Sequence, residues 1–121
     1  MFVNISNHPS TKWSKLQLDS AKALGNGEVT DIQFPDVHPM SSTEEVHMMA
    51  DIIVNQIKPN SIVMVQGEFS LTYAITSKLL AKNIKVVVAC TKRQSVEEID
   101  PNTRTVTKTS VFNFCQFRPV T

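Results

Sequence analysis

SIVMVQGEF (residues 61–69) and IKVVVACTKR (residues 84–93) are the two stretches that decide the fold of this chain. Each contains an apolar run rich in β-branched residues, which is typical of a strand covered on both faces. One helix-length segment separates them, so the two strands should be parallel and joined by a right-handed crossover. Both runs end in polar residues, and ligands bind outside the carboxyl ends of parallel strands. Function is therefore expected at this edge of the sheet.

The rest of the chain alternates in the same way between strand and helix patterns. Residues 14–17 (SKLQ) match a capping box that begins a helix, and Gly25 suits the end of that helix. Residues 41–45 (SSTEE) mark the start of a second capped helix. The predicted strands are 2–6, 28–34, 62–65 and 86–90, and the predicted helices are 15–24, a segment that begins at the serine pair 41–42, and about 70–82.

The C-terminal part has a different character. Residues 104–108 and 111–117 resemble two short strands joined by a turn at TKTS, which indicates a C-terminal β-hairpin. The whole order predicts an α/β fold: a Rossmann-like three-layer sandwich with a mostly parallel sheet and a C-terminal β-hairpin. A chain of 121 residues is expected to form one such domain over residues 1–121.

Composition narrows the classes of protein. Hydrophobic residues make up 41% of the chain and its net charge is +1, so duplex DNA is not an expected partner and any anion site must be local. No apolar run reaches the roughly 18 residues of a membrane span, and no leader pattern is present, so we expect a cytoplasmic protein without membrane contact. Cys90 and Cys115 lie in apolar strand patterns and are expected as buried thiols.

The loop after the first predicted strand, SNHPSTKW, offers the amide of Asn7, the imidazole of His8 and the hydroxyl of Ser10. Backbone N–H groups at the helix start that follows suit a phosphate. An alternative interpretation of equal weight is that Asn7 and Ser10 only satisfy hydrogen bonds within the loop and the helix cap. The loop lacks the glycines of a dinucleotide site and the chain lacks a Walker sequence, so no cofactor is expected.

The segment QGE follows the third predicted strand. The Gln66 amide can donate and accept, which makes it a ligand candidate at a strand end. Gly67 permits close approach of the backbone to a ligand, or simply a left-handed turn. Glu68 can stabilise a helix N-terminus without contacting any ligand.

The segment TKR, which follows the fourth predicted strand, is the strongest candidate for an anion site. Lys92 and Arg93 are adjacent cations beside Thr91, and arginine binds phosphate through two parallel hydrogen bonds. The alternative is a solvated charge pair with Glu97 or Glu98.

The three histidines have no zinc-ligand spacing, so no metal is expected.

At VMVQGEFSLTYAI (residues 63–75) and ACTKR (residues 89–93) the chain resembles a family of small CRISPR-associated Csx proteins. These are single-domain relatives of the CARF (Rossmann-like) sensors of type III CRISPR systems. Members are similar in a strand that ends in V-Q-G-acidic, an aromatic-containing helix, and a strand that ends in T-K-R. The resemblance covers residues 61–93 best. The loop SNHPSTKWS departs from the family pattern, which leaves the ligand contacts of the first loop open.

The resemblance implies a ring nuclease that linearises cyclic oligoadenylate, with cyclic tetra-adenylate as the first candidate, and so ends an antiviral signal. The ribose 2′-OH would attack the adjacent phosphodiester, and a homodimer would suit the two-fold symmetry of the ring. Two rival classes remain: a sensor or sponge that binds the ring without cutting it, and a small interaction protein. The implied roles are phosphate binding by Lys92 and Arg93, base or backbone contact by Gln66 and Gly67, ribose or phosphate contact by Asn7 and Ser10, and acid–base catalysis by His8.

Overall fold

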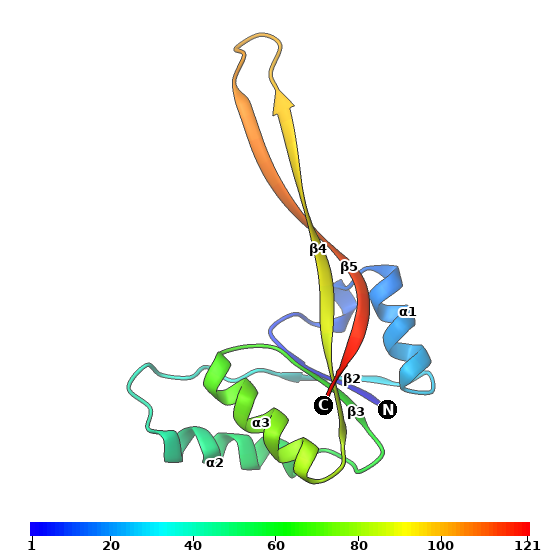
Figure 1. The fold of residues 1–121 in the computed structure, drawn as a ribbon, viewed down its shortest axis with the longest axis vertical. Coiled ribbons are helices and arrows are strands. Elements are labelled where there is room, and N and C mark those ends of the chain that lie inside the picture. The colour runs from blue at the N-terminus through cyan, green and yellow to red at the C-terminus, as the bar shows by residue number, and fades with distance from the viewer.

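The computed structural model describes residues 1–121 as a five-stranded sheet with helices on both faces (Figure 1). The strand order is β2-β1-β3-β4-β5; the first four strands are parallel and β5 pairs antiparallel with β4. This confirms the predicted α/β sandwich with a mostly parallel sheet and a hairpin at its C-terminal end. The strands are β1 (Phe2–Ser6), β2 (Val29–Gln33), β3 (Ile62–Val65), β4 (Lys85–Ile99) and β5 (Val106–Val120).

The helices form two layers that sandwich the sheet. Helix α1 (Lys15–Leu24) covers one face, where Ala21 packs with Phe2 and Met64. Helices α2 (Thr43–Val54) and α3 (Phe69–Ala81) cover the other face, which receives Val3 and Ile5 of the same strand. Successive side chains of a strand point to opposite faces, so β1 supplies both cores and is buried along its whole length. None of the three helices is long and apolar enough to cross a membrane.

The helix caps lie where the sequence predicts them. Ser42 and Glu45 form a complete capping box at the start of α2, whereas in α1 the hydroxyl of Ser14 accepts from the N–H of Gln17. Helix α3 begins one residue earlier than predicted, because the carboxylate of Glu68 caps it. These side chains satisfy N–H groups that have no partner within the helix.

Gly25 ends α1 for a different reason from the one predicted. Its φ is −99°, and the left-handed conformations belong to Asn26 and Gly27, with φ of 55° and 88°. A Cβ on Gly25 would lie 2.5 Å from the backbone nitrogen of Phe2. The position therefore needs a glycine because the helix end approaches β1 closely.

Strands β4 and β5 extend far beyond the rest of the sheet as a twisted two-stranded ribbon (Figure 1). Every residue from 91 to 113 is exposed. We call residues 91–113 the arm and the remainder of the chain the body. The arm continues the sheet through β4, whose first residues pair with β3 while its later residues pair with β5 alone.

The structure corrects the predicted ends of these strands. Strand β4 does not stop at Cys90 but runs to Ile99, and β5 is one strand rather than two short ones joined at TKTS. The turn lies instead at DPNTR, where the Asp100 carboxylate accepts from the N–H groups of Asn102 and Thr103. Those backbone hydrogen bonds, the one from Asn102 first, lower the pKa of Asp100. Asp, Pro and Asn favour this turn, whereas TKTS continues a strand.

A β-bulge lies where the arm leaves the body. Cys90 pairs with Gln116 and Thr91 pairs with Phe114, so Cys115 is an extra residue without a partner. The extra residue shifts the alternation of β5, and the rings of Phe114 and Phe117 therefore lie 4.8 Å apart. It also places the Cys115 thiol in solvent, and Cys90 is only half-buried, so neither is the buried thiol expected from the sequence.

Candidate functional site

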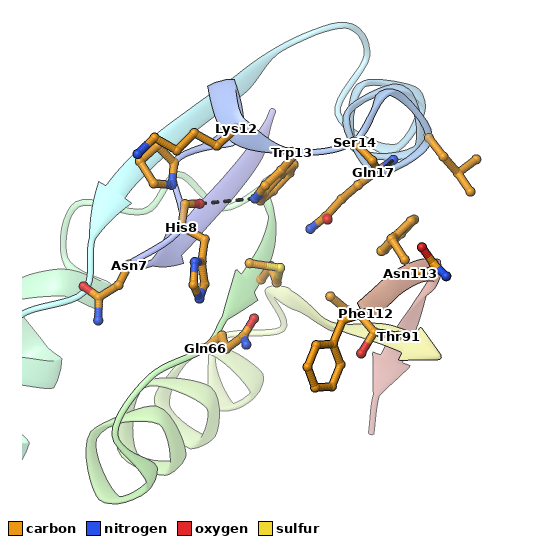
Figure 2. Close-up of a pocket in the computed structure, with 15 residues that line it drawn as sticks. Asn7, His8, Lys12, Trp13, Ser14, Gln17, Gln66, Thr91, Phe112 and Asn113 are labelled. Atoms are coloured by element: carbon orange, nitrogen blue, oxygen red, sulfur yellow. Dashed lines mark hydrogen bonds between the residues drawn. The ribbon is translucent and has the colours of Figure 1, made fainter. Parts of the chain in front are cut away.

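A cleft of about 880 Å³ opens at the junction of the body and the arm (Figure 2). One wall is the loop between β1 and α1, which includes the short 3₁₀ helix η1 (Ser10–Lys12); the opposite wall is the start of the arm. The end of β3 and the middle of β4, at Ala89, lie between the walls. The lining residues are Asn7, His8, Pro9, Lys12, Trp13, Ser14, Leu16, Gln17, Met64, Gln66, Ala89, Thr91, Phe112, Asn113 and Phe114.

A buried hydrogen-bond network fixes the first wall. Asn4 is 1% exposed, and its amide donates to the carbonyl oxygen of His8 at 2.9 Å and to Asp31 at 3.0 Å. The indole N–H of Trp13 also donates to the His8 carbonyl, at 3.2 Å (Figure 2). Because a buried amide without partners would cost free energy, this network holds the loop in one conformation. It leaves the imidazole of His8 as a lining group of the cleft.

Ser10 lies in the same loop but does not line the cleft. Its hydroxyl donates to the Asp31 carboxylate at 3.0 Å, and its backbone N–H donates to the same group. Asp31 is on β2, behind the wall. Ser10 therefore ties the loop to the edge of the sheet.

Gly67 and Glu68 also have structural roles in this chain. A Cβ on Gly67 would lie 2.5 Å from the ring of Phe34, which is 2% exposed, so the glycine makes room for that ring. The Glu68 carboxylate accepts from the Ser70 hydroxyl at 2.7 Å and from the N–H groups of Ser70 and Leu71 at 2.9 Å. These hydrogen bonds, the one from the Ser70 hydroxyl first, lower the pKa of Glu68.

Lys92 and Arg93 lie within β4 on the arm and outside the cleft. The guanidinium of Arg93 donates to the Ser110 hydroxyl at 3.0 Å, across the hairpin. The predicted alternative, an ion pair with a nearby glutamate of the same chain, is not formed either: Glu97 pairs with Lys108 at 3.4 Å. A continuing strand explains this, since it carries both cations away from the end of the sheet.

The cleft thus brings together four of the nine predicted site residues: Asn7, His8, Gln66 and Thr91. It adds Lys12 and Trp13, which the same loop sequence contains, and Phe112 from the arm. The adjacent cation and aromatic side chain in SNHPSTKW could have identified Lys12 and Trp13. Phe112 could not be found from the sequence, because its place depends on the length of the β4–β5 pairing.

The charge that lines the cleft is of one sign, positive. Lys12 is its one lysine or arginine, and no aspartate or glutamate lines it. Ser14 and Gln17 also line it, so the N-terminus of α1 opens toward the same space. A helix N-terminus carries a partial positive charge and free N–H groups. The arrangement favours an anionic ligand.

No cluster of three or more His, Cys, Asp or Glu side chains is placed to share a metal ion. The side chains that line the cleft supply an imidazole, an ammonium group, amides, hydroxyls and aromatic rings. These groups can bind a phosphate, stack a planar base and transfer a proton.

The fold is of the α/β class, in which ligands bind at the carboxyl ends of parallel strands, and the cleft lies at that edge of the sheet. The chain belongs to the family described as the uncharacterized protein MJ1673 family, whose model matches residues 1–118. No curated protein and no solved structure gives a significant match.

Proposed function

We propose that the cleft binds a cyclic oligoadenylate, with cyclic tetra-adenylate as the first candidate, and that the protein opens the ring without a metal ion. Such a Csx-type ring nuclease would act in the cytoplasm and switch off the signal of a type III CRISPR system. The observation that carries the proposal is the composition of the cleft: aromatic rings, amides and a lysine with no carboxylate. The aromatic rings and amides of the cleft suit adenine and ribose, and its lysine suits the phosphate.

The aromatic wall suits a nucleobase. Phe112 is 65% exposed at the start of the arm, and Trp13 lines the opposite wall. Stacking of a base on an aromatic side chain contributes about 1–3 kcal/mol to binding. The amides of Gln66 and Asn7 can each donate and accept toward the edge of a stacked adenine.

The phosphodiester would lie between Lys12 and the N-terminus of α1. Both supply positive potential, and no carboxylate in the cleft opposes them. In the proposed reaction His8 takes the proton of the ribose 2′-OH, and the 2′-oxygen attacks the adjacent phosphorus. The bond from phosphorus to the 5′-oxygen breaks and that oxygen takes a proton from solvent water, which leaves a 2′,3′-cyclic phosphate and a 5′-hydroxyl. Lys12 stabilises the charge that develops on phosphorus.

Binding without cleavage is the second candidate. It is favoured by the position of Lys92 and Arg93, because their place on the arm leaves Lys12 as the one lysine or arginine that lines the cleft. A sensor or sponge needs only the base and phosphate contacts. Under either candidate we expect a homodimer and no binding of duplex DNA.

Incubation of the purified protein with labelled cyclic tetra-adenylate in the presence of EDTA tests these candidates. Linear product with a 2′,3′-cyclic phosphate end supports the nuclease. Tight binding without product supports the sensor or sponge, and absence of binding rejects both in favour of an interaction protein.

Lys12→Ala should lower the single-turnover rate of cleavage at least tenfold, which corresponds to about 1.4 kcal/mol in the barrier. Lys58→Ala, an exposed lysine just beyond α2, is the matched control and should retain the rate of the unaltered protein. Lys92→Ala compares the two candidate phosphate sites: if it impairs cleavage and Lys12→Ala does not, the phosphodiester lies at the arm and this assignment of Lys12 is wrong.

A further inference from the structure

The arm has a free strand edge. Strand β3 pairs with β4 at residues 85–87, whereas β5 pairs with β4 on its other side as far as Ile99. Residues 88–99 therefore have no neighbouring strand on one side, where alternate N–H and C=O groups lack backbone partners. A two-stranded ribbon standing alone in water is marginally stable at best. A further strand along this edge would stabilise the arm.

The charges along the free edge are self-complementary. Lys92 and Arg93 precede an uncharged segment centred on Ser95, and Glu97 and Glu98 follow it at the same spacing. In an antiparallel pair, residues directly opposite each other project from the same face. A two-fold axis through Ser95 therefore sets Arg93 opposite the partner's Glu97 and Lys92 opposite the partner's Glu98.

We propose that two copies of this chain associate through these edges, with β4 pairing antiparallel to β4 of the partner about a two-fold axis at Ser95. The two arms then form one four-stranded ribbon in the order β5-β4-β4-β5. This is an isologous interface, in which each contact occurs twice. The inference depends on the arm alone and holds whatever ligand the cleft binds.

The register follows from the same charges. Centring the pair on Gln94 instead of Ser95 sets none of the four charged side chains opposite one of opposite sign, and centring it on Val96 leaves only Lys92 opposite an acid, Asp100 just beyond the end of β4. Moving the axis by one residue therefore leaves no ion pair in the first case and two instead of four in the second. Such pairs contribute little each when exposed, but they discriminate between registers that have the same number of backbone hydrogen bonds.

The outer edge of β5 is unsuited to the same role. Pro119 lacks an N–H group, and the bulge at Cys115 interrupts the edge. The two charged residues of β5 are Lys108 and Arg118, so a pair of β5 edges brings cations together without any acid. The arm as a whole carries four cations and three anions, a net charge of +1, which gives no basic surface for nucleic acid.

Charge-reversal variants test the interface by sedimentation velocity across a range of protein concentrations, without ligand. The unaltered protein should be a dimer. Arg93→Glu and Glu97→Arg should each raise the dimer dissociation constant at least tenfold, because like charges then face each other twice. An equimolar mixture of the two variants should form a heterodimer, since every reversed pair is again opposite in sign.

Two controls address other surfaces. Arg118→Glu changes a charge on β5, and Phe69→Ser removes an apolar side chain that is 79% exposed on α3. Both should leave the dimer intact. A monomeric unaltered protein at all concentrations, a mixture that stays monomeric, or dissociation by Phe69→Ser would each overturn the proposal.

The register has a distance test. With both cysteines replaced by serine, a spin label at residue 95 should give the shortest distance between copies. Moving the label to residue 91 should separate the two labels by ~26 Å along the strands, because each residue from the axis separates them by twice the ~3.3 Å strand rise. Equal distances at the two positions, or a shorter one at 91, would exclude the two-fold axis at Ser95.

Discussion

The two ends of strand β4 show how differently the body and the arm are stabilised. Val86 and Val87 are 2% and 5% exposed between two layers of helices, whereas Val96 and Ile99 of the same strand are 39% and 66% exposed. The body is stabilised by core side chains that are shielded from water. The arm relies on the hydrogen bonds of a hairpin and on a few cross-strand contacts. The candidate site lies where these regions meet, with a rigid loop on one side and exposed aromatic rings on the other.

The largest effect expected from this contrast comes from the same substitution in the two regions. Ile75→Ala removes a side chain that is fully buried between α3 and the sheet, and should lower the free energy of unfolding by about 2–5 kcal/mol. Ile99→Ala at the end of the arm should change it by less than about 0.5 kcal/mol. Chemical denaturation of both variants measures the difference. Equal losses would mean that the arm is packed as tightly as the body.

A smaller effect is expected at the end of α1. Gly25→Ala places a methyl group 2.5 Å from the Phe2 backbone and should destabilise the protein by about 3 kcal/mol. Gly27→Ala is the matched control, because its Cβ meets nothing within 4 Å and only its φ of 88° is unfavourable, at about 1 kcal/mol. Thermal melts of both variants rank them. If Gly27→Ala destabilised the protein more than Gly25→Ala, backbone conformation and not the lack of space for a Cβ would be what requires glycine at the end of α1.

The smallest effect concerns the Glu68 cap. Glu68→Gln keeps an acceptor but loses the charge, so it should melt at a slightly lower temperature than the unaltered protein at neutral pH. The pKa of Glu68 is lower in the folded protein than its ordinary value of 4.5. The ionised carboxylate therefore stabilises the folded protein fully at pH values above 4.5. The difference between the two proteins should shrink as the pH falls from 4.5 through the folded pKa. A difference independent of pH would contradict the capping role.

Much of the body could be predicted from the sequence because local signals and burial agree there. The apolar runs of β3 and of the first half of β4 and the helix N-caps at Ser14 and Ser42 are where the patterns indicate, although only Ser42 forms a complete capping box. The arm could not be predicted in the same way. Its residues show no apolar alternation, since neither face is buried, and the turn signal in DPNTR lies between segments that look polar.

The site shows the same division. Asn7, His8 and Gln66 follow strands of the body and line the cleft, as their positions after the strands indicate. Lys92 and Arg93 do not, because the strand that was expected to end before them continues. The spacing of these two cations from Glu97 and Glu98 becomes informative only once the structure shows that one edge of β4 is free to pair.

The single tryptophan of the chain allows the most direct test of the proposed ligand site. Trp13 lines the cleft, so its fluorescence should change saturably as cyclic tetra-adenylate is added in the presence of EDTA. Phe112→Ser should weaken that binding about tenfold or more, because it removes a stacking surface of the cleft. A Trp13 signal that does not respond to the ligand, or the same affinity in Phe112→Ser, would contradict a nucleotide site at the junction of the body and the arm.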